Sequence, residues 1–276
     1  MNKVTAAALL EMKKRGEKIT ALTAYDAPGA RFLNDAGVDV VLVGDSVGNV
    51  RLGYENTLPV TLEEMLSHTQ AVKRGNSRAF LVTDMPYLTY QLSPDEARRN
   101  AGRLVKEGGA EAVKLEGGME AAAAIKAIVD LNIPVIGHLG LTPQAIHKIG
   151  GYKIQGKTDA AREKMITDAK ILEGAGVCAL VLECIPADLA AIITKTVSVP
   201  TLGIGAGPDC DGQILVTDDL LGLTQGPVPN FVKPYADLKT AVTRALKDFT
   251  RDVRAGKYPA QSKTAAPGEP VPQRDS

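Results

Sequence analysis

The sequence predicts a single-domain (β/α)8 barrel, the TIM-barrel form of the α/β class. Short apolar, β-branched runs recur along the chain and alternate with longer segments of helical spacing, as repeated βα units do. Most of these runs are almost continuously apolar, which is typical of parallel strands covered on both faces. Eight such runs in 276 residues favour a closed barrel over a doubly wound open sheet, the alternative architecture.

The apolar runs define the predicted strands. These are residues 19–25, 38–44, 79–83, 112–116, 134–139, 178–183, 201–204 and 214–217. Two intervening helices begin with capping signals, since Thr61 precedes Glu64 by three residues and Ser93 precedes Glu96 by three. Apolar periodicity predicts the other helices. These are residues 28–36, 119–130, 158–175, 187–197 and 235–254, after a short N-terminal helix that ends at Gly16.

Composition limits the domain plan and the partners. We expect one catalytic domain over residues 1–255 and a disordered tail over 256–276, where Pro, Ser, Thr, Gln and Ala accumulate. A formal net charge of zero gives no indication of nucleic acid as a partner, and no apolar run approaches the roughly 18 residues that span a bilayer. The three cysteines form no Cys-x-x-Cys pattern, so we expect no zinc knuckle and a cytoplasmic location.

Three acidic residues stand at the ends of predicted strands: Asp45, Asp84 and Glu116. Parallel strands place their carboxyl ends at one edge of the barrel, where ligands bind, so we expect the three carboxylates to meet there. Carboxylate oxygens suit Mg²⁺, Ca²⁺ or Mn²⁺ better than zinc. The alternative for each acid taken alone is an ordinary loop-capping role, which aspartate often has.

Further polar residues mark the same edge. Lys114 lies two residues before Glu116, so both side chains point to one face of their strand, and Glu183 ends the sixth strand. Lys114 has the alternative role of ion-pair partner to Glu116. His138, on the fifth strand, has the alternative role of a hydrogen-bonded core histidine. Ser46 follows Asp45 directly.

A glycine-rich segment, residues 203–208, is a weak indication of a nucleotide site. Its spacing does not match Gly-x-Gly-x-x-Gly, and no predicted helix begins directly after it. Tight backbone packing at the barrel mouth explains these glycines equally well.

Over roughly residues 3–255 the chain resembles the ketopantoate hydroxymethyltransferase family, also called 3-methyl-2-oxobutanoate hydroxymethyltransferases. The resemblance rests on long motifs in a fixed order. They are TAYD at 23–26, VGDSVGN at 43–49, DMPY at 84–87, VKLEG at 113–117, GHLGLTP at 137–143, LECIP at 182–186 and GIGAGPDCDGQ at 203–213.

This resemblance implies a TIM barrel with bound Mg²⁺, the 2-oxo acid 3-methyl-2-oxobutanoate as acceptor and 5,10-methylenetetrahydrofolate as one-carbon donor. It assigns the metal ligands to Asp45, Asp84 and Glu116, and the catalytic acid/base to Glu183. Substrate contacts fall on Asp45, Ser46, Asp84 and Lys114, with His138 at an active-site position. It also implies a homo-oligomer, a decamer of paired five-membered rings. The product would be 2-dehydropantoate, on the route to pantothenate and coenzyme A.

The chemistry of the residues agrees with that assignment. A metal that chelates a 2-oxo acid stabilises the enolate charge formed at C3, and Lys114 can neutralise the same charge. Glu183 lies outside the three-acid set, so we expect it to accept the proton.

Two other functions remain open at this point. One is a Mg²⁺-dependent 2-oxo acid carbon–carbon lyase of the isocitrate lyase type, which usually needs a catalytic cysteine. Cys184 follows Glu183, but strand alternation predicts that it points to the opposite face. The other is a non-catalytic 2-oxo acid binding barrel, for which an intact base has no use.

Overall fold

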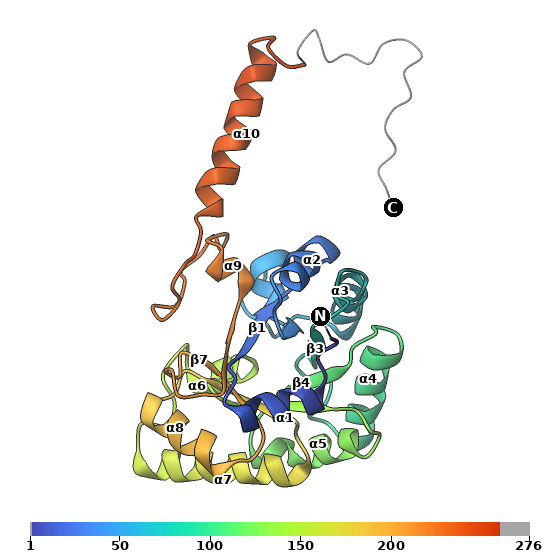
Figure 1. Cartoon of the computed structure of the whole chain (residues 1–276), viewed down its shortest axis with the longest axis vertical. Helices are drawn as coiled ribbons and strands as arrows, with labels where there is room; N and C mark the ends of the chain where they lie inside the picture. Colours follow the sequence, from blue (N-terminus) through green and yellow to red (C-terminus); the bar gives the residue numbers. More distant parts are fainter. Residues whose placement is uncertain (1, 260–276) are drawn as a thin grey trace.

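The computed structural model describes residues 2–259, and its centre is a closed barrel of eight parallel strands (Figure 1). Each strand pairs with the next along the chain, and β8 pairs with β1. The strands are β1 (Ile19–Thr23), β2 (Val40–Val43), β3 (Phe80–Asp84), β4 (Ala112–Glu116), β5 (Val135–Gly140), β6 (Ala179–Glu183), β7 (Thr201–Ile204) and β8 (Gly212–Leu215). The predicted barrel is therefore confirmed, and the open-sheet alternative is wrong.

Helices surround the barrel and occupy the predicted segments, while the short helices α6 and α9 lie outside them. They are α1 (Ala6–Arg15), α2 (Ala27–Asp35), α3 (Leu62–Gly75), α4 (Pro94–Lys106), α5 (Ala122–Val129), α6 (Ile146–Ile149), α7 (Asp159–Ala175), α8 (Ala187–Thr196), α9 (Thr217–Leu220) and α10 (Leu238–Arg254). Short 3-10 helices form η2 (Met119–Ala121) and η3 (Pro143–Ala145), and a π-helix forms η1 (Gly48–Leu52). Thr61 and Glu64 form the full capping box at α3, whereas Ser93 only accepts the Glu96 N–H.

Two apolar layers hold the barrel together. Alternate residues of the strands, such as Leu42, Val82 and Ile136, fill the barrel interior. The other residues of the strands pack against the helices in an outer layer. Leu9 of α1 is fully buried in the interior cluster, so α1 closes the amino-terminal end of the barrel. The carboxyl end is left for the loops and the site.

The eighth strand begins two residues earlier than predicted. Residues 212–215 pair with residues 19–22 of β1, and Thr217 already begins α9. Gly212 and Gln213 do not extend the apolar run that predicts this strand. The close pairing itself requires the glycine, since a Cβ at position 212 would collide with the Ile19 carbonyl oxygen.

The last helix does not cover the barrel. Figure 1 shows α10 standing away from it, and no residue of α10 is buried. The connection from β7 to β8 contains no helix, and α9 has only 4 residues. Thr20 of β1 and Gln213 of β8 are accordingly exposed on the outside of the barrel.

Two further predictions concern the ends and the membrane. Of the tail predicted for 256–276, residues 260–276 lie outside the described part of the chain. No helix among the described residues is long and apolar enough to cross a bilayer.

Candidate active site

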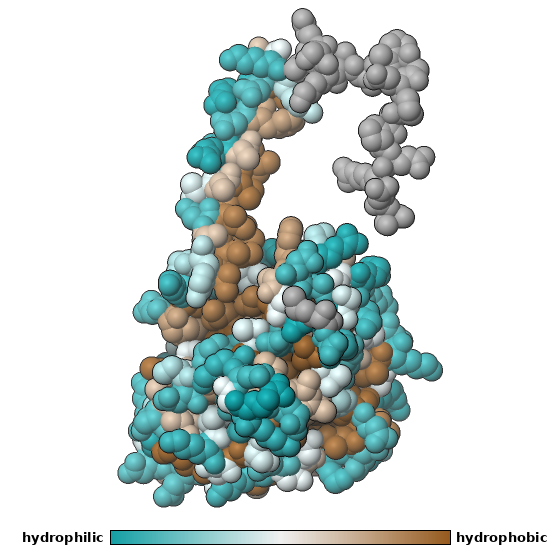
Figure 2. All heavy atoms as spheres, viewed as in Figure 1, coloured by the Kyte–Doolittle hydropathy of each residue, from teal (hydrophilic) through white to brown (hydrophobic). Residues whose placement is uncertain are grey.

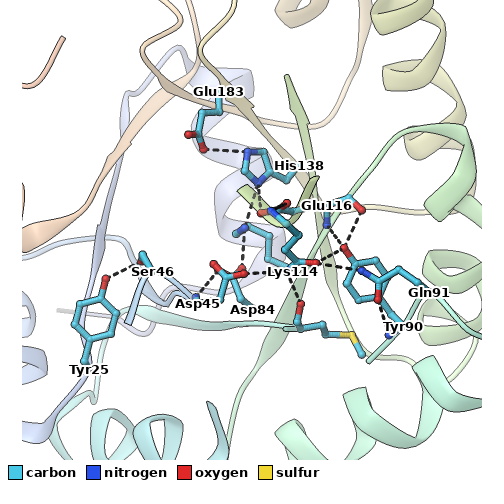
Figure 3. A network of polar contacts seen from close by, with 12 residues as sticks. Tyr25, Asp45, Ser46, Asp84, Tyr90, Gln91, Lys114, Glu116, His138 and Glu183 are labelled. Carbon is cyan, nitrogen blue, oxygen red and sulfur yellow. Dashed lines mark hydrogen bonds and ion pairs between the residues drawn. The ribbon is translucent and has the colours of Figure 1, made fainter. Parts of the chain in front are cut away.

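A cavity of about 1000 Å³ opens at the carboxyl ends of the strands. All seven residues predicted for the site line it: Asp45, Ser46, Asp84, Lys114, Glu116, His138 and Glu183. Figure 3 shows these side chains converging from several strands. The structure thus gathers residues that are up to 138 positions apart in the sequence, as expected for adjacent strands of a barrel.

Strand register sets the first contact. Asp84 of β3 lies opposite Lys114 of β4, and the Lys114 Nζ atom is 2.8 Å from Asp84 Oδ1. Both side chains are buried. The alternative ion pair of Lys114 with Glu116 is therefore wrong, because residues two apart on one strand are farther apart than register partners on neighbouring strands. Burial alone lowers the pKa of Lys114, but the surrounding carboxylates, Asp84 first, raise it and keep the ammonium charged.

His138 bridges two acids. It lies opposite Glu116 in the register, with Nδ1 3.5 Å from Glu116 Oε1, and its Nε2 is 3.1 Å from Glu183 Oε2. Burial and Lys114 lower the pKa of His138, yet the hydrogen bonds to Glu116 and Glu183 outweigh them and raise it to about 9. The raised pKa favours a charged imidazole between the two carboxylates, and the Lys114 Nζ atom lies 3.3 Å from its Nδ1. His138 is buried, as the alternative role of a core histidine requires. Its partners, however, are the predicted site residues Glu116 and Glu183.

Asp45 carries an unfavourable charge. It follows β2, and its backbone N–H donates to Asp84 Oδ2 at 3.0 Å. Burial, and then the negative charges of Asp84 and Glu116, raise the pKa of Asp45 well above its usual value. Burial likewise raises the pKa of Asp84, against the opposing effect of Lys114. Three buried carboxylates therefore crowd a space that one lysine does not neutralise.

Ser46 is held at the edge of this group. Its Oγ lies 2.8 Å from the hydroxyl of Tyr25, which follows the end of β1 by two residues. The π-helix η1 begins two residues after Ser46, and its residues Asn49, Val50 and Arg51 also line the cavity. π-Helical turns often occur at functional sites.

Two residues of the site were not predicted. Gln144, in η3, donates from Nε2 to Asp45 Oδ2 at 2.9 Å and from its backbone N–H to Glu116 Oε2 at 3.0 Å. The Tyr90 hydroxyl lies 2.9 Å from Gln144 Oε1 and accepts the Glu116 backbone N–H at 3.2 Å. Neither is charged, so neither stands out in the sequence as a buried charge that needs a partner. The only sequence signal is position, since Gln144 follows the GHLGLTP motif at a strand end.

The donor set suits a hard divalent cation in its chemistry. Oxygen ligands from carboxylates are what Mg²⁺ and Mn²⁺ prefer, and such a cation would offset the excess negative charge. As they stand, however, no three His, Cys, Asp or Glu side chains within residues 2–259 form a group that could hold a metal ion. Lys114 forms an ion pair with Asp84 Oδ1, and Gln144 donates a hydrogen bond to Asp45 Oδ2.

Cys184 departs from its predicted direction. Strand alternation ends at Glu183, because Cys184 has a left-handed backbone with φ of 48°, and it lines the same cavity. The expectation that it faces away is therefore wrong. Burial, and then the charge of Glu183, raise the pKa of its thiol to about 11.

The glycine-rich segment at 203–208 is explained by packing. A Cβ at Gly203 would lie 2.9 Å from Cys210 Sγ, and one at Gly205 would lie 2.8 Å from the Phe231 ring. Such contacts leave space only for glycine. The nucleotide interpretation therefore has no structural support.

The fold and the acid-lined cavity define a TIM-barrel enzyme with its site at the usual carboxyl edge. A family model described as ketopantoate hydroxymethyltransferase matches residues 3–261. The chain belongs to the ketopantoate hydroxymethyltransferase family, as its motifs predicted, and so is a transferase enzyme of pantothenate biosynthesis.

Curated relatives agree over most of their length. The chain is 57% identical over 257 residues to the 3-methyl-2-oxobutanoate hydroxymethyltransferase of Thermoanaerobacter sp. (strain X514), covering 93% of this chain and 94% of that one. It is 55% identical over 260 residues to the enzyme of the same name from Moorella thermoacetica, covering 94% and 97%.

Solved structures show the same fold at low identity. A phosphonopyruvate hydrolase in complex with oxalate and Mg²⁺ is 16% identical with a TM-score of 0.60, covering 96% of this chain and 92% of that one. A 2,3-dimethylmalate lyase of the PEP mutase/isocitrate lyase superfamily is 16% identical with a TM-score of 0.56, covering 95% and 91%.

Proposed function

We propose that the protein transfers a hydroxymethyl group from 5,10-methylenetetrahydrofolate to C3 of 3-methyl-2-oxobutanoate and forms 2-dehydropantoate. The observation that carries the proposal is the separation of the acids into two groups. Asp45, Asp84 and Glu116 lie together beside Lys114. Glu183 lies apart from these acids and contacts His138. One group suits charge stabilisation, and the other acid is free to move a proton.

Asp45, Asp84 and Glu116 would hold Mg²⁺. When bound, the cation would act as a Lewis acid that stabilises negative charge on the keto oxygen of the substrate. The negative charge that Lys114 leaves unneutralised supports this assignment, as does the oxygen-only donor set. The phosphonopyruvate hydrolase of the same fold has Mg²⁺ and oxalate in its complex, and oxalate resembles the two-oxygen end of a 2-oxo acid.

Lys114 and Ser46 would receive the oxo acid. The Lys114 ammonium stays charged in its buried position and attracts the substrate carboxylate and the enolate oxygen. Ser46 Oγ, fixed by Tyr25, can donate to a substrate oxygen at the edge of the carboxylate group. Both residues line the cavity beside Asp84.

Glu183 would take the proton from C3. His138 Nε2 lies 3.1 Å from Glu183 Oε2, and this contact would orient the carboxylate and leave its other oxygen for the substrate. The C–H electron pair becomes the enolate. Water cleaves both C–N bonds of the methylene bridge, so that each folate nitrogen takes one of its protons and the carbon is released as formaldehyde carrying the water oxygen. The enolate attacks this carbon, and the alkoxide that forms takes back the proton from Glu183.

The size of the cavity supports a second, larger substrate. A small acid at the carboxylates fills only part of about 1000 Å³. Tyr152, Ile154 and Phe231 line the rest and offer apolar surface for a planar ring system. We place the folate donor there, above the oxo acid.

We also propose that the chain forms a homo-oligomer through α10. Val242, Leu246, Phe249 and Val253 recur at helical spacing and are 45–62% exposed. Figure 2 shows this apolar surface along the helix. Within residues 2–259 no helix covers the barrel over β8 and β1, where Thr20 and Gln213 are exposed. In the oligomer, α10 of a second copy would cover the outside of β8 and β1, which would also bury the apolar face of that helix. The assembly we expect is a decamer.

Turnover tests the reaction. The full-length protein with Mg²⁺, 3-methyl-2-oxobutanoate and 5,10-methylenetetrahydrofolate should form 2-dehydropantoate and tetrahydrofolate in equal amounts. Binding of the oxo acid without turnover would instead support the non-catalytic barrel. Folate-independent cleavage of a hydroxy acid would support the lyase, the function that the presence of Cys184 in the cavity keeps as the second candidate. The raised pKa of its thiol counts against that candidate.

A further inference from the structure

Gln144 is a buried, fully hydrogen-bonded amide among the acids of the site. It is 8% exposed, and its Nε2 uses both N–H groups, one on Asp45 Oδ2 at 2.9 Å and one on the Met85 carbonyl oxygen at 3.0 Å. Its backbone N–H independently holds Glu116 Oε2 at 3.0 Å. A single residue therefore contacts two carboxylates that come from different strands.

The orientation of the amide is fixed from its other end. The Tyr90 hydroxyl lies 2.9 Å from Gln144 Oε1, and Gln91 Nε2 donates to the same oxygen at 3.2 Å. Tyr90 is 4% exposed and also bonds the backbone of Glu116. A flipped amide would turn its oxygen toward the Asp45 carboxylate and the Met85 carbonyl, both of which are acceptors, so only one orientation satisfies the group.

The neutrality of Gln144 is what distinguishes it from Lys114. Both donate to site carboxylates, but Lys114 also neutralises charge, whereas an amide directs a carboxylate and leaves its negative charge for a cation. Gln144 engages one oxygen of Asp45 and one of Glu116. The second oxygen of each carboxylate stays free of this glutamine.

We propose that Gln144 is a positioning residue that holds the carboxylates of Asp45 and Glu116 for a divalent cation, with Tyr90 fixing the orientation of its amide. This inference rests on the metal site of the proposed function. Outer partners that orient metal ligands typically change metal affinity by roughly 10- to 100-fold when they are removed.

Mn²⁺ binding to the full-length protein tests the proposal, with free Mn²⁺ measured by electron paramagnetic resonance. Gln144→Met keeps the length of the side chain and the backbone bond to Glu116 but removes the donor to Asp45. Its Mn²⁺ dissociation constant should rise by roughly 10-fold or more. Tyr90→Phe keeps the amide and removes only its orienting hydroxyl, so the rise should be smaller. Gln70→Leu, which removes a surface glutamine that bonds the Glu107 carbonyl oxygen, should leave the constant unchanged.

Thermal unfolding of each variant separates positioning from folding. A folded Gln144→Met protein with the Mn²⁺ affinity of the wild type overturns the inference. If Gln144→Met does not fold, Tyr90→Phe decides, and wild-type affinity in that variant overturns it equally. Absence of Mn²⁺ binding by the wild type overturns the metal site and this inference together. Wild-type binding that is lost in Asp45→Ala but kept in Gln144→Met overturns the inference alone.

Discussion

The Nε2 atom of His138 lies 3.1 Å from the Oε2 atom of Glu183, while the other nitrogen of the same ring faces Glu116. One imidazole thus connects an acid of the proposed metal group to the acid proposed as base. The strand register produces this arrangement, because Glu116 is opposite His138 on β4 and β5, and Glu183 lies on the next strand.

Replacement of Glu183 by glutamine should abolish exchange of the C3 proton. The amide cannot accept a proton, so exchange of 3-methyl-2-oxobutanoate into deuterated water should fall by roughly 100-fold or more, while oxo acid binding persists. Nuclear magnetic resonance follows the exchange, and calorimetry follows the binding. Glu163→Gln, on the exposed side of α7, is the matched control. Exchange at the wild-type rate in Glu183→Gln would remove Glu183 as the base.

Replacement of His138 by asparagine should slow the same exchange by a smaller factor. The variant keeps Glu183 but removes the imidazole that contacts it, and we expect a loss of roughly 10- to 100-fold in exchange rate. The double variant with Glu183→Gln should be no slower than Glu183→Gln alone, because the two residues act as one unit. Additive losses in the double variant would show that His138 acts independently of Glu183.

The three acids proposed as metal ligands should differ in their effects on stability. Asp45→Ala, Asp84→Ala and Glu116→Ala should each weaken Mg²⁺-dependent oxo acid binding in calorimetry. Asp84→Ala should also lower the free energy of unfolding by about 3–5 kcal/mol, because it leaves the buried Lys114 ammonium without its partner. Asp45→Ala removes one of the crowded charges and should cost less. Unchanged binding in all three variants would rule out the metal site.

The barrel and its acids could be predicted because each leaves a local signal in the sequence. Buried parallel strands need continuous apolar runs, and Asp84 or Glu116 at the end of such a run stands out as a charge that needs a partner. The roles of these acids stay predictions, but their meeting at one cavity follows from the βα alternation alone.

The missed features depend on geometry that no short segment encodes. Lys114 pairs with Asp84 instead of Glu116 because of the register between β3 and β4. Cys184 faces the cavity because its backbone is left-handed, which ends the alternation of β6. Gln144 carries no charge and lies in the short 3-10 helix η3 after β5, where polar residues are ordinary. The direction of α10 depends on contacts beyond a single chain, according to the oligomer we propose.

The apolar face of α10 should control the oligomeric state. Leu246→Glu places a charge at the centre of this face, and we expect it to lower the mass of the particle measured by light scattering after size-exclusion chromatography. Arg244→Glu, on the opposite side of the helix, also changes the charge but should leave the mass unchanged. A wild-type protein that elutes as a monomer would contradict the proposed assembly.

The thiol of Cys184 should react slowly at neutral pH and faster at high pH. Burial, and then the neighbouring charge of Glu183, raise its pKa to about 11, so little thiolate is present at pH 8. Alkylation by iodoacetamide should therefore be roughly 100-fold slower than for a free cysteine of pKa about 8.5, and its rate should rise until the pH reaches about 11. Peptide mass spectrometry measures the modified fraction. Glu183→Gln should accelerate the reaction, because it removes the negative charge that disfavours the thiolate. If Cys184 reacts at pH 8 as fast as a free cysteine, it is an activated thiol, and the lyase becomes the better interpretation of this cavity.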